Sequence, residues 1–236
     1  MKINKKFKVL SVGMLLVLSL GVIGCSSKGE EGYSEIDAAK TEELVGENEK
    51  TLVIDVRDSE KYAAGHLADA INIPFDEFEA RIDELAGYEN QNIVLICNTG
   101  NKSGKAAKML VDKGFKKVNN AQDGMEEHDY KTVTYNNVTG GAFEKLASEN
   151  KNAVVVDVRD AKDYDKSHIE NSINIPIDDF EAKFNELDEY KDKDILIYCS
   201  IGRRSAKAAG ILTENGYEKA TNSVDGVKEY EFKLSK

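Results

Sequence analysis

The chain repeats itself at a constant offset of 102 residues. Residues 51–128 align with residues 153–230 without a gap, and 32 of the 78 pairs are identical. Shared segments include DVRD at 55–58 and 157–160, and INIP at 71–74 and 173–176. A period near 100 residues is too long for a solenoid unit and matches one small domain. The sequence therefore predicts a duplicated domain, with one copy over residues 33–130 and the other over residues 135–236.

Each copy carries the pattern of an α/β domain. Short, continuous apolar runs occur at residues 51–56, 92–96, 153–158 and 194–198. Continuous rather than alternating apolarity is typical of strands buried on both faces, which favours a mainly parallel sheet. Helical spacing predicts flanking helices, two of them at residues 105–114 and 207–216, closed by Gly114 and Gly216. We expect two tandem α/β domains, each with a mainly parallel central sheet flanked by helices.

The first 24 residues have the pattern of a removable leader. A lysine-rich start precedes an apolar run at residues 9–24 that is short for a membrane span. The run ends in VIGC at 22–25, which resembles the lipobox of bacterial lipoproteins. We therefore expect a signal peptide over residues 1–24, lipid on Cys25 and a polar tether over 25–32. The mature protein would be extracytoplasmic, lipid-anchored to the bacterial cell membrane. An ordinary secretory signal or an uncleaved anchor is the alternative.

Net charge restricts the partners of the mature chain. The formal charge is −11, and removal of a leader with four lysines would make it about −15. An acidic surface argues against nucleic acid or anionic lipid as the main partner, and solubility alone accounts for such a charge. We expect no nucleic-acid partner.

The two remaining cysteines, Cys97 and Cys199, each follow an apolar run and precede a helix-like stretch. A helix N-terminus presents unpaired N–H groups and a partial positive charge, which favour a thiolate over a thiol. If the intervening loop curls, its amides converge above the sulfur as an anion-binding nest. The predicted binding residues are Ser200, Ile201, Gly202, Arg203, Arg204 and Ser205 in one copy, and Asn98, Thr99, Gly100, Asn101, Lys102 and Ser103 in the other.

The second loop, CSIGRRS, has the residues for an anionic substrate. Gly202 allows the backbone angles that curling needs. Arg203 and Arg204 add donors suited to a multi-oxygen anion. Ser205 is the expected N-cap of the helix and can also touch the sulfur. Such a loop predicts a site that accepts an anion and stabilises a charged covalent cysteine intermediate.

In both copies the chain resembles the rhodanese (thiosulfate sulfurtransferase) family. The resemblance rests on DVRD, on GHLADAINIP (65–74) and SHIENSINIP (167–176), and on YCSIGRRSAKAA, which is similar to the family's Cys-x-x-Gly-x-Arg-Ser loop. It implies transfer of a sulfane sulfur from thiosulfate or a similar donor to cyanide or a thiol, through a persulfide on Cys199. Arg203 and Arg204 would hold the donor's sulfonate, and the thiol could belong to a protein. No metal or organic cofactor is implied.

Two features depart from the family pattern. Long two-domain rhodaneses usually lack the cysteine in their first domain, whereas Cys97 is present here, followed by Asn101 and Lys102 in place of the arginines. Lys102 cannot grip a sulfonate in bidentate fashion, so this site is expected to be weaker, differently selective or a relic. Each repeat also ends in Asp-Gly, at 123–124 and 225–226, where the family often has two glycines; this could change the floor of the pocket.

Other repeated residues are expected to be structural. We expect Asp55 with Arg57, and Asp157 with Arg159, to form ion pairs at strand ends rather than to act in catalysis. His66 and His168 lack an evident partner for base catalysis and are expected to be hydrogen-bonded in the fold. Tyr198 is expected in the core.

Three alternatives to a sulfurtransferase remain open at this point. A cysteine phosphatase or arsenate reductase of related fold has a loop one residue longer, with arginine where this chain has Ser103 and Ser205. A persulfide carrier or redox-sensing module would load or relay sulfur, including from one cysteine to the other, without turning over thiosulfate. A structural disulfide between Cys97 and Cys199 is the third alternative.

Overall fold

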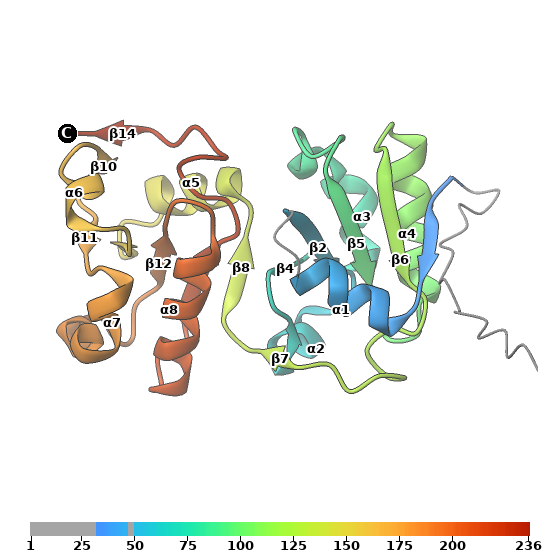
Figure 1. Cartoon of the computed structure of the whole chain (residues 1–236), viewed down its shortest axis with the longest axis horizontal. Coiled ribbons are helices and arrows are strands. Elements are labelled where there is room, and N and C mark those ends of the chain that lie inside the picture. The colour runs from blue at the N-terminus through green and yellow to red at the C-terminus, as the bar shows by residue number, and fades with distance from the viewer. Residues whose placement is uncertain (1–31, 47–49) are drawn as a thin grey trace, which may run out of the picture.

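The computed structural model describes residues 32–46 and 50–236, which form two similar α/β units lying side by side along the longest axis (Figure 1). The expectations for residues 1–31 lie outside the described residues. The first unit contains β1 (Ser34–Ile36), α1 (Ala38–Gly46), β2 (Thr51–Asp55), α2 (Ser59–Ala64), β3 (His66–Leu67), β4 (Ala70–Asn72), α3 (Phe75–Arg81), the 3-10 helix η1 (Ile82–Leu85), β5 (Asn92–Ile96), α4 (Asn101–Asp112), β6 (Lys117–Ala121) and β7 (Thr132–Val133).

The second unit repeats this order. It contains β8 (Asn136–Val138), α5 (Gly140–Glu149), β9 (Val154–Asp157), α6 (Ala161–Tyr164), β10 (His168–Ile169), β11 (Ile173–Asn174), α7 (Ile177–Lys183), the 3-10 helix η2 (Phe184–Tyr190), β12 (Ile195–Tyr198), α8 (Arg203–Glu214), β13 (Ala220–Ser223) and β14 (Leu234–Ser235). No helix within the described ranges combines the length and the apolarity needed to cross a bilayer.

Each unit is built on a five-stranded sheet in which every pairing is parallel. The strand order is β1-β6-β5-β2-β4 in the first unit and β8-β13-β12-β9-β11 in the second. Short antiparallel pairs, β3 with β7 and β10 with β14, are added at the side. The predicted fold, two tandem α/β domains with parallel central sheets, is confirmed.

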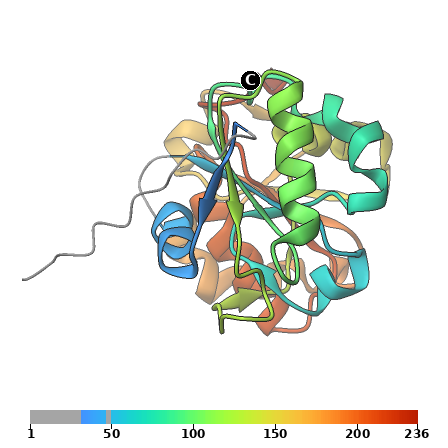
Figure 2. The same cartoon turned by 90° about the vertical axis from the view of Figure 1, so that its right-hand side faces the viewer.

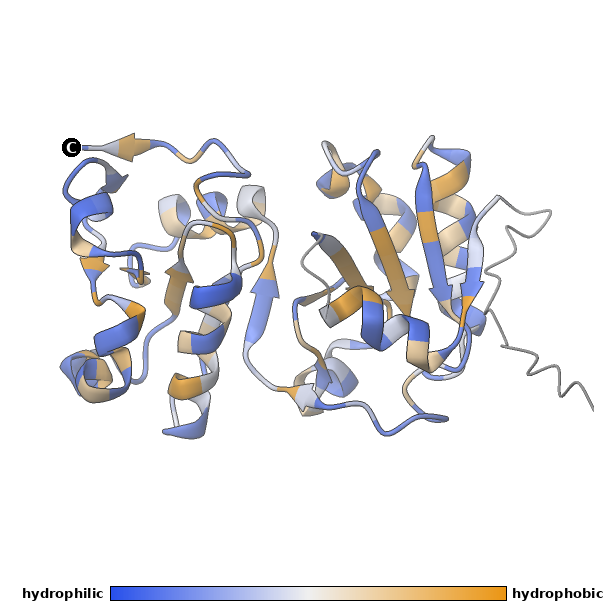
Figure 3. Cartoon of the chain, viewed as in Figure 1, coloured by the Kyte–Doolittle hydropathy of each residue, from blue (hydrophilic) through white to orange (hydrophobic). Residues whose placement is uncertain are grey.

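Helices cover both faces of each sheet, so the central strands are buried on both sides. In β2, Leu52 and Ile54 pack with Phe78 of α3 and Leu110 of α4, while Val53 packs on the opposite face with residues of α1. Figure 2 shows α1 on one face and α3 with α4 on the other. Full burial of such a side chain stabilises the fold by about 1.5–3 kcal/mol. The continuous apolar runs in the sequence have this cause, and β2 and β12 are accordingly hydrophobic in Figure 3.

The two units meet at the edge strands β4 and β8. The backbone N–H of Asn137 in β8 donates to the Tyr62 hydroxyl at 3.2 Å, and the Asn137 side-chain amide donates to the Ala70 carbonyl of β4 at 3.1 Å. Both bonds are buried, so neither is replaced cheaply by water. The junction therefore contains specific, buried hydrogen bonds between the two units.

A carboxylate of the second unit also holds the first. Asp225, 2% exposed, accepts hydrogen bonds from the Tyr88 hydroxyl and the Lys50 ammonium of the first unit. It accepts a third from the Gly140 N–H at the start of α5, at 2.6 Å. Desolvation by burial and the negative charge of Asp225 together raise the pKa of Tyr88. The turn that carries Asp225 is thus anchored across the junction.

Candidate active site

Each cysteine lies directly after a central strand, at the edge where parallel strands end. Cys97 follows β5 and is 3% exposed, and Cys199 follows β12 and is fully buried. Ligand sites of open α/β sheets form at this edge. Both thiols are free, so the disulfide considered as an alternative is absent from the structure.

The loop after each cysteine leads directly into a helix, which begins four residues earlier than predicted. Gly100 and Gly202 are the N-cap residues of α4 and α8, with φ of 77° and 82°. At Gly202 an added Cβ would lie 2.3 Å from the Val224 carbonyl oxygen. The expected N-cap role of Ser205 is wrong, because the left-handed turn at Gly202 already starts the helix and Ser205 falls within its first turn.

The predicted contact between serine and sulfur is present in both copies. The Ser205 hydroxyl lies 3.4 Å from Cys199 Sγ and 2.8 Å from the Gly202 carbonyl oxygen. The Ser103 hydroxyl lies 3.3 Å from Cys97 Sγ. A hydroxyl has one proton to donate, and it can rotate toward the sulfur when the sulfur is charged.

The Asp-Gly turn of each unit packs directly against the cysteine loop. An added Cβ at Gly226 would lie 1.9 Å from the carbonyl carbon of Ser200, and one at Gly124 would lie 2.3 Å from the Asn98 carbonyl oxygen. The Val227 N–H donates to the Cys199 carbonyl at 3.0 Å. The glycine of each Asp-Gly turn therefore makes the close approach to the loop. The aspartates bond the first turn of a neighbouring helix instead, Asp123 at Ala38 and Asp225 at Gly140.

The two arginines of the second loop diverge. Arg204 donates to the Ser200 hydroxyl at 2.9 Å and lies 3.8 Å from the Asp160 carboxylate. Arg203 instead lines a cavity of about 330 Å³ between the units, together with Ile201 and the half-buried Asp69. Burial raises the pKa of Asp69, and the charge of Arg203 partly offsets this. Arg204 is thus hydrogen-bonded to the cysteine loop itself, whereas Arg203 lines the cavity between the units.

A separate cavity of about 270 Å³ opens at Cys97. Its lining includes the predicted loop residues Asn98, Thr99, Asn101 and Lys102. It also includes four residues that the loop motif does not point to, which are Arg57, Asp58, Lys61 and Glu126. These residues come from the start of α2 and from the turn after β6, which the topology brings to the same edge of the sheet. Of these four, Arg57 and Asp58 recur in the second copy within the DVRD segment, and this repetition is the sequence signal that points to them.

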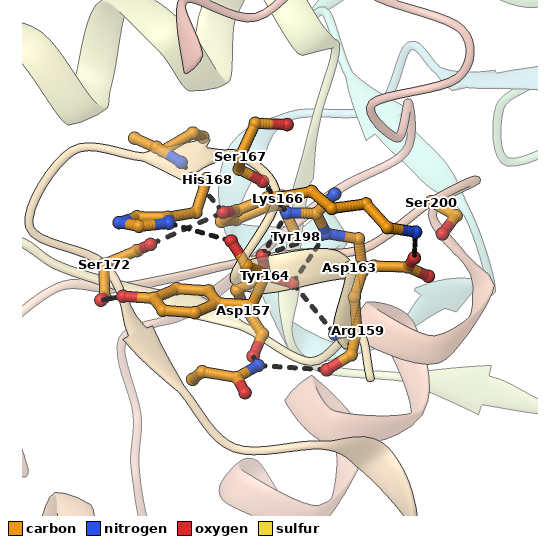
Figure 4. Close-up of polar contacts among 12 residues, drawn as sticks. Asp157, Arg159, Asp163, Tyr164, Lys166, Ser167, His168, Ser172, Tyr198 and Ser200 are labelled. Carbon is orange, nitrogen blue, oxygen red and sulfur yellow. Dashed lines mark hydrogen bonds and ion pairs between the residues drawn. The ribbon is translucent and has the colours of Figure 1, made fainter. Parts of the chain in front are cut away.

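The Asp-Arg pairs are ion pairs, as predicted. Asp157 is fully buried and binds the Arg159 guanidinium in bidentate fashion, with a closest distance of 2.6 Å (Figure 4). Arg159 also donates to the Ser167 carbonyl at 2.7 Å and lies over the Tyr198 ring. Asp55 and Arg57 repeat the arrangement. Each pair thus joins the end of a central strand to the following loop.

The histidines and Tyr198 are structural, as predicted. His66 Nδ1 donates to the Tyr62 carbonyl at 2.9 Å and the ring stacks on Tyr62. His168 repeats this with Tyr164 (Figure 4). Burial lowers the pKa of His66. Tyr198 is fully buried, and its hydroxyl accepts from the Ile169 N–H at 3.0 Å. In the described part of the chain, no three His, Cys, Asp or Glu side chains are grouped as metal ligands.

Comparison with known proteins identifies the fold family. The family model for the rhodanese-like domain matches residues 37–129 and again residues 141–233. A putative sulfur carrier protein, YrkF, of Bacillus subtilis is 36% identical over 107 residues, covering 45% of this chain and 57% of the relative. A tRNA uridine(34) hydroxylase of Cronobacter sakazakii is 30% identical over 112 residues, covering 46% of this chain and 32% of the relative. The chain thus spans little more than half the length of one curated relative and a third of the other.

Among solved structures, a thiosulfate sulfurtransferase from Pseudomonas aeruginosa aligns with 85% of this chain and 43% of its own, at 16% identity and a TM-score of 0.37. A structure described as rhodanese with anions from E. coli aligns with 36% of this chain and 99% of its own, at 32% identity and a TM-score of 0.33. Since the family model covers most of the chain in two successive matches, the chain belongs to the rhodanese family and contains two rhodanese-like domains in tandem.

Proposed function

We propose that the protein is a sulfurtransferase that moves a sulfane sulfur from thiosulfate or a similar anionic donor to a thiophilic acceptor. The observation that carries the proposal is the constellation repeated at Cys97 and Cys199. Each sulfur lies at the end of a central strand, before a helix N-terminus, with a serine hydroxyl 3.3–3.4 Å away. These groups all favour a thiolate, which is the form of cysteine that attacks sulfur.

The reaction has two displacements. In the first, the Cys199 thiolate attacks the sulfane sulfur of thiosulfate; a sulfur–sulfur bond forms to the protein, the bond within thiosulfate breaks, and sulfite leaves with the electron pair. In the second, cyanide or a thiolate attacks the outer sulfur of the persulfide, and Cys199 leaves as thiolate. First-turn N–H groups of α8, which have no acceptor within the helix, would stabilise the charge on sulfur in both steps.

Arg204 is the loop cation available to the donor. Its contact with Asp160 is 3.8 Å long, and the two side chains are 32% and 48% exposed. Such a pair contributes at most about 1 kcal/mol, so the guanidinium can turn to a sulfonate at little cost. Arg203 faces the junction between the units. It would therefore attract the anionic donor at long range rather than bind it directly.

A persulfide carrier without turnover is the second candidate. It is favoured by the burial of both sulfurs and by the likeness to a relative described as a putative sulfur carrier. A carrier would take up one sulfur and hold it until a partner protein arrives. Formation of thiocyanate from thiosulfate and cyanide separates the two candidates, because only the enzyme releases product repeatedly.

We also propose that Cys25 carries a lipid that anchors the protein outside the cytoplasm. The proposal rests on VIGC at residues 22–25 after an apolar run. The test is phase partitioning of the expressed protein in a detergent that separates on warming. Wild type is expected in the detergent phase and Cys25→Ser in the aqueous phase; equal partitioning of the two would contradict the proposal.

The experiment for the main proposal is thiocyanate formation by wild type, Cys97→Ser, Cys199→Ser and the double variant. The double variant is expected to be inactive, whereas each single variant retains the activity of the other site. If wild type hydrolyses p-nitrophenyl phosphate and Cys199→Ser does not, the protein is a phosphatase instead. Turnover that survives in the double variant would contradict a persulfide on either cysteine.

A further inference from the structure

The cavity at Cys97 is lined by side chains of both charges. Three cations, Arg57, Lys61 and Lys102, and two carboxylates, Asp58 and Glu126, line it together with the cysteine loop. The cations come from two separate segments of the chain, the start of α2 and the first turn of α4. An anion bound in this cavity would lie close to these groups.

The three cations differ in how far they are already neutralised. Arg57 is bound to the buried Asp55 and to the Gly65 carbonyl. Lys102 lies 3.9 Å from Asp76, whose side chain is 87% exposed, and such a contact is weak. Among the described residues, no ion pair involves the Lys61 ammonium. Lys61 is therefore the cation of this cavity without a direct ion pair to any described residue, although the charge of Asp58 acts on it through space.

The second repeat carries the opposite charge at this position. Lys61 corresponds to Asp163, and Glu126 corresponds to Lys228, at the constant offset of 102 residues. Asp163 is neutralised in turn by Lys166 at 3.0 Å. Since α2 and α6 begin at equivalent points of the same fold, neither charge is needed to form the helix. The exchange reverses the sign of the charge at this position of the helix.

We infer that Lys61 is a substrate-binding residue of the Cys97 site, where with Lys102 it supplies the positive charge that Arg204 supplies in the other loop. The inference rests on the proposed function and deepens it. The ligand of this site would be a small sulfur oxyanion, such as thiosulfate, whose charged oxygens lie between α2 and α4. The two sites then receive the donor from different sides. In the first repeat the added cation lies on the helix before the loop, and in the second the corresponding helix position carries Asp163.

The first test measures local charge without sulfur transfer. Iodoacetate and iodoacetamide alkylate the same thiolate, but only iodoacetate is an anion, so the ratio of their rates at Cys97 reports the potential there. Both reagents need the same opening of a buried thiol, and that factor cancels. Lys61→Asp replaces a positive charge by a negative one and should lower the ratio of the iodoacetate rate to the iodoacetamide rate about fivefold at low salt. Lys61→Ala only removes the positive charge and should lower the logarithm of this ratio about half as much.

Lys116→Asp is the matched control. Lys116 is exposed and immediately precedes β6, so it lies at the opposite edge of the sheet from Cys97. The same charge change there should leave the ratio within measurement error. The reciprocal variant Asp163→Lys should raise the ratio at Cys199. If Lys61→Asp changes the Cys97 ratio no more than Lys116→Asp, the inference is overturned.

The second test measures sulfur loading from thiosulfate in the full chain with Cys199→Ser. Lys61→Asp should raise the thiosulfate concentration at half-maximal loading rate about fivefold or more, with the control unchanged. Loading of Cys97 that does not respond to Lys61→Asp overturns the inference and leaves the proposed function standing. Failure of both cysteines to load in wild type overturns the proposed function, and the inference with it, whatever the alkylation ratio.

Discussion

The close approach of Gly226 to the Cys199 loop makes a quantitative prediction. An ideal Cβ on Gly226 would lie 1.9 Å from the carbonyl carbon of Ser200 and 2.1 Å from the amide nitrogen of Ile201, whereas ordinary contact begins at 3.4 Å. Gly226→Ala must therefore move the loop by about 1.5 Å. Hydrogen bonds from the turn to the Cys199 and Ser200 carbonyls, at 3.0 and 3.1 Å, oppose that movement.

The expected cost has a stability part and a chemical part. Inserting a methyl group into a close-packed contact costs about 1–3 kcal/mol of unfolding free energy. A nucleophile displaced by about 1 Å loses about 100-fold in rate. Gly226→Ala should therefore fold, with reduced stability, and should load sulfur on Cys199 about 100-fold more slowly than wild type.

The assay is the rate of sulfur uptake from thiosulfate at each cysteine, measured by mass spectrometry of the separated peptides after rapid quenching. Cys97 in the same molecule is the internal control and should load at its normal rate. Gly210→Ala is the matched variant, because a Cβ there meets only the Tyr135 ring at 3.8 Å. It should stabilise α8 by about 0.5–1 kcal/mol and leave loading unchanged. Wild-type loading of Cys199 in Gly226→Ala would refute the account of the loop.

Three further variants test the scaffold around the sites, each by urea unfolding. Asp157→Ala should destabilise the protein by about 3–5 kcal/mol, because it leaves the Arg159 guanidinium, 5% exposed, without its partner; a loss below 1 kcal/mol would contradict the structural role of the pair. Burial lowers the pKa of His66 in the folded state, so the unfolded chain takes up its proton first, and the unfolding free energy should fall as pH drops from about 7 to 5. The part of this pH dependence that is due to His66 should vanish in His66→Gln. If the variant and the wild type show the same pH profile, His66 makes no such contribution. Tyr88→Phe should cost about 1–3 kcal/mol by removing a buried hydrogen bond to Asp225; stability equal to wild type would show that the bond does not hold the units together.

Much of the fold could be predicted from the sequence because its causes are local or repeated. Strands buried on both faces require continuous apolar runs, and β2 and β12 occur where those runs predicted them. The constant offset of 102 residues fixed the tandem arrangement without any knowledge of structure. The cysteine loops were also predicted, since a strand, a short glycine-containing loop and a helix place a thiol at the sheet edge.

The rest depended on the packing of segments that are far apart in the chain. The two loop arginines are adjacent in sequence, but successive helical residues point in different directions, and so Arg203 lines the junction while Arg204 stays at the loop. The sequence indicated only that the Asp-Gly turn could change the pocket floor, whereas the bond of Asp225 to Tyr88 joins residues 137 positions apart. Lys61 enters the Cys97 cavity only because α2 and α4 converge at one edge of the sheet.

The central claim is that the cysteines accept sulfane sulfur, and the most direct test is the intact mass of the purified, reduced protein after incubation with thiosulfate. The account predicts a gain of one sulfur atom at Cys199 and one at Cys97, with an equivalent of sulfite released for each. Cyanide should restore the original mass and yield thiocyanate. An unchanged mass at both cysteines, with the thiols still alkylatable, would contradict it.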